Sequence, residues 1–472
     1  MGQEIETHRF RPQDFAEYRA RLARETELLA ESLADASFAT DAPTGGYEVE
    51  ACLIDAGGHP APINTALLER LHHPCVVAEL ARFDVEINTP PRQLCANVLA
   101  CMHDDLRDIW RCCNSAAREL DAELLIVGIL PTLTDSELTL ACMTPHERYR
   151  ALNEQVFRLR RGRPIALDIT GREHLVTTHR DVMLEAATTS FQMHLQVTPE
   201  NAARRYNTAV ILSAPMVAVA ANSPFLFGRD LWDETRIPLF EQSVDIANGV
   251  TAARVTFGDG YVRSSLMECF RENLERHTVL LPVLQDEPPE QFAHVRLHNG
   301  TIWRWNRPLI GFNGDGRPHL RIEHRVVPAG PSLVDEIANA ALFFGLMQRL
   351  GKADPPLESL LPFAAARANF YAAARSGLRA ELTWLSGRHV TARQLLLEVL
   401  LPRAREGLME LELAPEDIAH YLGVIEGRLR TGRNGAQWQR DYVARHGAHM
   451  ESLTCAYREH QRTDAPVHEW PL

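Results

Sequence analysis

The chain has 472 residues, 45% of them hydrophobic and 24% charged, which is an ordinary globular composition. The formal net charge of −13 argues against nucleic acid or an anionic membrane surface as a partner. Apolar runs are too short to cross a bilayer, the first residues lack a signal-peptide core, and the nine cysteines form no CxxC pair, so we expect a cytoplasmic protein with reduced thiols.

The first third of the chain shows alternating helix and strand patterns. Pro12 suits the first turn of a helix, and apolar residues follow it at helical spacing. In chain order, the patterns predict a helix over residues 11–35, a strand around 44–55, a short helix over 64–71, a strand over 82–91, a helix over 95–120 and a buried strand over 123–130.

The remainder begins with a mixed region rich in loops, residues 131–189. The strict alternation of "SFQMHLQV" predicts a strand over 190–197, and Thr198 then caps a helix. The segments "HNGTIWRWNRPLI" and "HLRIEHRVV" predict a strand pair joined by a glycine-rich turn, and from about 331 the chain is almost wholly helical. We therefore predict an α+β catalytic core over 1–345 and a helical C-terminal part over 346–472.

The predicted strands share an unusual pattern, an apolar face opposite a face of carboxylate, amide, imidazole or guanidinium groups. A solvated outer face would more often carry Thr, Ser and Lys, and we weigh that plain interpretation equally with a metal–nucleotide site. The polar faces are Glu48, Glu50 and Cys52; Asp84, Glu86 and Asn88; Gln192, His194 and Gln196; and Arg321, Glu323 and Arg325.

These residue types suit phosphate chemistry. Carboxylates and imidazole are ligands for Mg²⁺ or Mn²⁺, and arginine forks match phosphate. If the faces converge, the acidic groups need cations, because each unpaired buried carboxylate costs several kcal/mol. Lys352 is the only lysine beside 48 arginines, and its surroundings lack the motif of a lysine-containing phosphate loop, so neither such a loop nor a Schiff-base lysine is expected. Phosphate would therefore be bound by arginine and metal.

The same segments resemble the glutamate–cysteine ligase superfamily, most closely its carboxylate–amine ligase branch. The resemblance rests on five motifs in chain order and covers about residues 44–345. They are "YEVEACLID", "RFDVEINTPP", "MHLQVTPENAARRYN", the specific signature "AVAANSPFLFGRD", and "RIEHRVVPAGPS".

The resemblance implies a curved antiparallel sheet forming a funnel, like the glutamine synthetase catalytic domain, with helices outside. It implies that ATP phosphorylates a carboxylate, usually the γ-carboxyl of glutamate, and that an amine then attacks the acyl phosphate. By the resemblance, Glu48, Glu50, Glu86, His194 and Glu323 hold Mg²⁺ (or Mn²⁺), Arg321 and Arg325 meet phosphate charge, and Arg236 binds the substrate carboxylate. Gln192 and Asn222 are further candidates for binding substrate or ATP, and the Asn222 amide suits a helix end or loop backbone equally well.

Several alternatives stay open. Cysteine is the default amine by resemblance, as in glutathione synthesis, but Gln192 replaces a histidine common in the branch, so another amine is almost equally favoured. Small-molecule substrates are expected, and a homo-oligomer is among the options. A catalytically silent nucleotide or metabolite binder is the alternative from another class, and a metal hydrolase has too few clustered histidines. Glu79 is either a further ligand or a surface acid, and the loop 430–441 either caps the site or connects helices.

Overall fold

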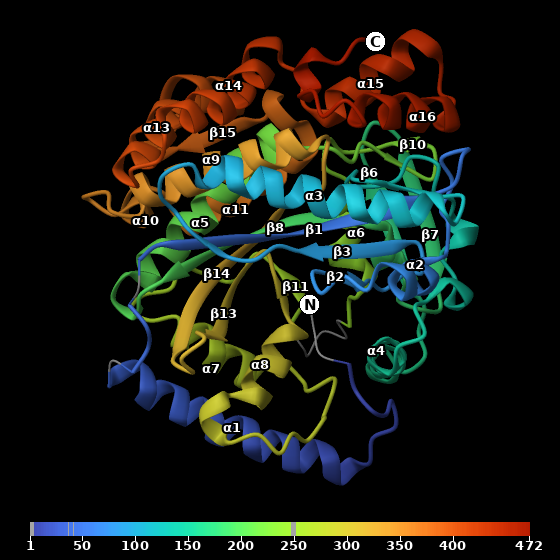
Figure 1. The fold of residues 1–472 in the computed structure, drawn as a ribbon. Helices are drawn as coiled ribbons and strands as arrows, with labels where there is room; N and C mark the ends of the chain where they lie inside the picture. The colour runs from blue at the N-terminus through green and yellow to red at the C-terminus, as the bar shows by residue number, and fades with distance from the viewer. Residues whose placement is uncertain (1–3, 36, 41, 247–251) are drawn as a thin grey trace.

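The computed structural model describes residues 4–35, 37–40, 42–246 and 252–472, and its centre is a curved antiparallel sheet with helices on both faces (Figure 1). In the described part of the chain this sheet has eight strands. Its main path runs β13 (Asn306–Phe312), β14 (Pro318–Pro328), β8 (Ser190–Val197), β1 (Thr44–Ile54), β3 (Asp84–Asn88) and β2 (Val76–Ala78), with β4 (Arg92–Gln93) and β5 (Glu123–Leu125) paired to β1. The predicted α+β class is confirmed.

The apolar faces of the strands pack against a layer of helices, α3 (Val98–Arg118), α5 (Pro199–Ala220) and α9 (Leu333–Leu350). On β1, the Tyr47 hydroxyl donates a 2.6 Å hydrogen bond to the carbonyl of Met102 in α3. On β14, the His324 ring stacks on Phe343 of α9 with centroids 4.5 Å apart. Because strand side chains alternate, this packing turns the polar faces towards the opposite, concave side of the sheet.

The helices on the opposite side are α1 (Pro12–Ala34), α4 (Glu147–Leu159), α7 (Met267–Arg276) and α8 (Ala293–Gly300), which lie below the sheet in Figure 1. The Tyr18 hydroxyl of α1 donates a 2.8 Å hydrogen bond to the carbonyl of His294 in α8. Glu25 of α1 contacts the same histidine through its carboxylate. These contacts hold α1 against α8, on the side of the sheet that carries the polar faces.

The C-terminal region packs on the outer helices and is mostly helical, as predicted. Helix α9 runs continuously through the predicted boundary at 345, so that boundary is not a break in the structure. The hairpin of β15 (Glu381–Trp384) and β16 (Arg388–Thr391) interrupts the helices. The helices are α10 (Leu357–Leu360), α11 (Phe363–Ser376), α12 (Ala392–Leu395), α13 (Leu401–Glu410), α14 (Pro415–Thr431), α15 (Gly435–His446) and α16 (Met450–Gln461).

Some local predictions were wrong in extent. Residues 298–300 end α8 instead of opening a strand: His298 contacts the Asn273 carbonyl of α7 at 3.0 Å, and Asn299 donates to the Pro308 carbonyl of β13 at 2.8 Å. The buried strand predicted over 123–130 is only the three residues of β5, and the loop-rich region contains α4 and the hairpin of β6 (Ile165–Thr170) and β7 (His174–His179). The remaining elements are α2 (Asn64–Leu71), α6 (Arg236–Ser243), β9 (Phe225–Leu226), β10 (Arg229–Asp230), β11 (Val255–Thr256) and β12 (Trp303–Arg304). Among the described helices, none has the length and apolar character needed to span a membrane.

The close packing of α9 on α13 depends on two glycines. A Cβ atom at Gly407 would collide with the carbonyl oxygen of Gly345, and one at Gly345 would collide with the carbonyl of Ala404. We expect Gly407→Ala to lower the free energy of unfolding by about 1–3 kcal/mol, because the backbones must separate. Gly423→Ala in α14 is the matched control, since its Cβ would meet no atom within 4 Å. Equal denaturant midpoints for the two variants would contradict this explanation.

Candidate active site

The strand registers bring the polar faces predicted from the sequence together. Glu50 of β1 lies opposite Glu86 of β3, and Glu48 lies opposite Gln192 of β8. On the other side of β8, His194 lies opposite Glu323 of β14. The predicted convergence of acidic strand faces is therefore present. Within the described ranges, the ligand atoms gather in two separate clusters rather than in one.

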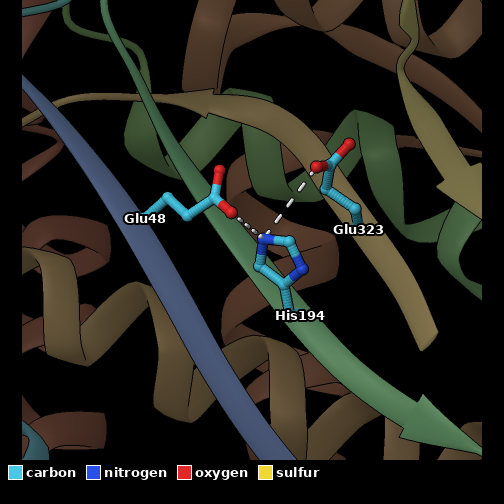
Figure 2. Close-up of side chains that lie close together, drawn as sticks. All are labelled: Glu48, His194 and Glu323. Carbon is cyan, nitrogen blue, oxygen red and sulfur yellow. Dashed lines mark ion pairs between the residues drawn. The ribbon is translucent and has the colours of Figure 1, made fainter. Parts of the chain in front are cut away.

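The first cluster consists of Glu48, His194 and Glu323, which point towards one another from β1, β8 and β14 (Figure 2). His194 Nε2 lies 3.3 Å from Glu48 Oε1 and 4.0 Å from Glu323 Oε1. The imidazole is buried, and neither ring nitrogen makes a hydrogen bond to the described residues. Two carboxylates and an unbonded imidazole at this spacing can share one divalent cation.

Arginines keep the first cluster ionised. Arg307 of β13 binds Glu323 in bidentate fashion, with Nε 2.7 Å from Oε2 and Nη2 2.9 Å from Oε1. Burial alone would raise the pKa of Glu323, but Arg307, Arg325 and His194 hold it at about 2. Burial likewise opposes ionisation of Glu48, yet His194 and then Arg321 hold the pKa of Glu48 well below its usual range. Arg307 was missed in the sequence, although its position opposite Glu323 could have indicated it.

The second cluster consists of Glu50, Glu79 and Glu86, all buried. Glu50 accepts hydrogen bonds from the Ser190 amide at 2.6 Å and from Gln192 Nε2 at 2.8 Å. Glu79 follows β2, and its Oε1 is buried without a hydrogen bond to the described residues. Of the two roles left open for Glu79, the structure therefore favours that of a further ligand.

The second cluster carries an excess of negative charge. Burial and then the charge of Glu86 raise the pKa of Glu50 to about 8. Burial, Glu86 and Glu50 raise the pKa of Glu79 well above its usual value. Glu185, in the short 3-10 helix Met183–Ala187, was missed in the sequence; burial and Glu79 raise its pKa to about 8. Crowded buried carboxylates of this kind are stabilised by a bound cation.

Gln192 and Arg325 link the two clusters. The guanidinium of Arg325 donates to Gln192 Oε1, and the amide of Gln192 donates to Glu50 of the second cluster. Arg325 Nη1 also lies 3.2 Å from Glu323 Oε2 of the first cluster. A positive charge therefore stands between two sets of carboxylates.

A cavity of about 480 Å³ adjoins the first cluster beneath β13 and β14. Glu48 and Glu323 line it, together with Arg321. The size and the mixture of charged and apolar walls are typical of a small-molecule site. Further lining residues are Arg148, Arg296 and Arg307, and the apolar groups Leu152, Phe270, Leu281, Leu297, Trp303, Leu309 and Ile310. Both Trp303 and Trp305 pack against Phe240, and of the two only Trp303 lines the cavity.

Two predicted ligand-binding residues have other contacts. Arg236 is buried, with Nε 3.0 Å from Glu234 Oε1 and Nη2 2.6 Å from the carbonyl oxygen of Val326. Asn222 is buried, and its Nδ2 donates to the Ala329 carbonyl and the Tyr457 hydroxyl, both at 2.8 Å. The contacts of both side chains are to the protein itself, so their assignment to substrate or ATP binding is not supported.

The loop 430–441 does not close over the cavity. Only residues 432–434 form the connection between α14 and α15, and 435–441 belong to α15. The segment packs behind the signature segment, where the Ala436 amide donates to the Ala221 carbonyl at 2.8 Å. Asn434 caps α15 and also donates to the carbonyl of Ala218 at 3.1 Å. Of its two interpretations, the helix connection fits the contacts.

The comparisons with known proteins show the family of the chain. The family model for "glutamate-cysteine ligase family 2" matches residues 44–459, which include every residue of both clusters. The chain belongs to glutamate–cysteine ligase family 2. Family membership makes the chain an ATP-dependent carbon–nitrogen ligase. A search of curated protein sequences finds no match.

Two solved structures have the same fold as this chain. The glutamate–cysteine ligase of Francisella tularensis in complex with AMP has a TM-score of 0.55 and 11% identity, covering 92% of this chain and 91% of its own. A bifunctional glutathione synthetase from Pasteurella multocida has a TM-score of 0.56 and 11% identity, covering 96% of this chain and 55% of its own. At this identity the likeness establishes the fold, including the predicted funnel-shaped sheet.

Proposed function

We propose that the protein uses ATP and Mg²⁺ (or Mn²⁺) to phosphorylate a small-molecule carboxylate and joins it to an amine, with the γ-carboxyl of glutamate as the first candidate. The observation that carries the proposal is the pair of carboxylate clusters on either side of Gln192 and Arg325, next to an arginine-lined cavity. The Francisella glutamate–cysteine ligase was solved in complex with AMP, which supports nucleotide use in the same fold.

The donor sets of the two clusters fit divalent cations. Glu48, His194 and Glu323 would hold one cation, and Glu50, Glu79 and Glu86 another, since buried oxygen ligands with one imidazole suit Mg²⁺ or Mn²⁺. When bound, the cations would supply positive charge that neutralises the phosphate oxygens. Cluster members would thereby escape the repulsion that raises the pKa of Glu50 to about 8.

The arginines divide the remaining work. Arg321 lines the cavity and would bind phosphate oxygens of the nucleotide. Arg325, between the clusters, would stabilise the charge that develops when a carboxylate oxygen attacks the γ-phosphorus and ADP leaves. In the second step the amine nitrogen attacks the acyl carbon, and the carbon–oxygen bond to phosphate breaks. The proton lost by the amine nitrogen leaves with phosphate or solvent.

The proposal is tested by ADP release with glutamate and a panel of amines and amino acids, cysteine first, followed by the mass of the product. We expect ADP release that requires both substrates and Mg²⁺, and a product heavier than glutamate by the amine minus one water. Tight ATP binding without ADP release in any combination would contradict a ligase and favour the silent nucleotide-binding alternative. A product with cysteine would support a role in glutathione synthesis.

A further inference from the structure

Strand β14 has an irregularity at Arg325. His324 pairs with Met193 of β8, whereas the next paired residue, Val327, lies opposite Phe191. Arg325 and Val326 therefore stand together opposite the single residue Gln192, as in a β-bulge. Bulges leave backbone groups outside the strand ladder and change the direction of a side chain, often beside active sites.

Arg236 occupies the carbonyl side of this bulge. The first residue of α6, it places Nη2 2.6 Å from the carbonyl oxygen of Val326 and Nη1 3.4 Å from that of Arg325. The amide of Arg325 is held from the other side by the Trp305 carbonyl at 3.0 Å. The Arg236 guanidinium also lies over the Trp305 ring, 5.4 Å from its centroid. The carbonyl of Arg325 is thus bound by the Arg236 side chain and its amide by the Trp305 backbone, and Arg236 and Trp305 contact each other.

A chain of hydrogen bonds supports Arg236 from the C-terminal part. Arg236 Nε donates to Glu234 Oε1 at 3.0 Å, and Glu234 Oε2 accepts from the backbone N–H of Asn222 at 2.9 Å. Gln439 of α15 then donates to the Asn222 side chain at 3.0 Å. The predicted ligands Arg236 and Asn222 therefore belong to one connection that runs from α15 to the bulge.

We propose that Arg236 is a positioning residue, which fixes the bulge in β14 and thereby directs the Arg325 guanidinium between the two carboxylate clusters. The inference rests on the proposed ligase function, because it assigns a role within that site. It replaces substrate binding with backbone binding as the role of Arg236. A fork of planar donors is required, since two carbonyls and one carboxylate must be bound at once.

Arg236→Lys tests the proposal, because lysine keeps the charge beside Glu234, but its single nitrogen cannot occupy the three positions from which Nε, Nη1 and Nη2 bind. We expect kcat for ADP release to fall by about 10- to 100-fold, while the KM values for ATP and for the carboxylate stay within about threefold. A direct substrate-binding role would instead raise the KM for the carboxylate. Arg440→Lys is the matched control, since Arg440 is equally buried and binds Asp230 and Asp233 without contacting β14; its kcat should be unchanged.

A double-mutant cycle with Arg325→Met separates positioning from contact. Once the Arg325 guanidinium is absent, Arg236→Lys should cause less than about a twofold further loss. The same loss in both backgrounds, or a raised KM for the carboxylate, would overturn the proposal. If Arg236→Lys does not fold, Glu234→Gln should give the same kcat effect in weaker form, and an unchanged kcat would also overturn it. Absence of ADP release by the wild type would instead mean that the proposed function fails.

Discussion

Glu48→Gln is expected to abolish ADP release, with a loss of at least about 10³-fold. Glu48 is held in its ionised form beside His194, so the substitution removes a full negative charge from the first cluster. Glutamine has almost the same shape but is a weak ligand for Mg²⁺. ADP release with saturating substrates measures the loss, and the rise of the melting temperature on adding Mg²⁺ should also be smaller.

Glu154→Gln is the matched control for this experiment, because it makes the same chemical change at an exposed position on α4. It should leave both turnover and the effect of Mg²⁺ unchanged. Turnover of Glu48→Gln within about twofold of the wild type would remove Glu48 from the metal site. A fall in melting temperature with normal specific activity would show a structural role only.

Removal of divalent cations is expected to make stability strongly dependent on pH. Burial and Glu86 raise the pKa of Glu50 from 4.5 to about 8, so the folded metal-free protein binds a proton that the unfolded chain does not. This stabilisation is complete below about pH 4.5 and is lost as the pH rises to about 8. The lowered pKa of Glu323 acts only below 4.5, so it does not offset the loss. Mg²⁺ takes the place of the protons and should restore stability.

Differential scanning calorimetry across this pH range, with chelator or with Mg²⁺, measures the effect. The melting temperature of the chelated protein should fall as the pH rises, and Mg²⁺ should raise it most at the alkaline end. Glu50→Gln is the diagnostic variant, because a neutral side chain at this position removes part of both the pH dependence and the Mg²⁺ response. A melting temperature that stays flat with pH in chelator would contradict the assignment of the second cluster.

The polar strand faces are the part of the site that could be predicted from the sequence, because side chains alternate along a strand. This alternation is a local property, so the polar faces of Glu48, His194 and Glu323 could be recognised without knowing how the strands pair. The division into two clusters depends on register between strands that are far apart in sequence, and it was not predicted. Arg307 was missed for a different reason, since β13 and β14 form a predicted pair and only its register places Arg307 opposite Glu323.

The roles of Arg236 and Asn222 show a second limit. Both lie in or near a recognisable family motif; resemblance assigned Arg236 to the substrate, and Asn222 was left open between a ligand and the protein backbone. The insertion of one residue in β14 creates backbone carbonyls that need a partner, and no periodicity in "RIEHRVV" indicates it. The helical C-terminal part was predicted correctly as helical, but its link to Asn222 through Gln439 could not be foreseen.

The first cluster takes its members from strands at residues 44–54, 190–197 and 318–328, and these strands pair directly. Contacts between such distant segments carry a high entropic cost of loop closure and form slowly. A fragment or a nascent chain that lacks β14 would lack Glu323, so its first cluster would be incomplete. The first cluster is therefore complete only after β14 has been synthesised and has paired with β8.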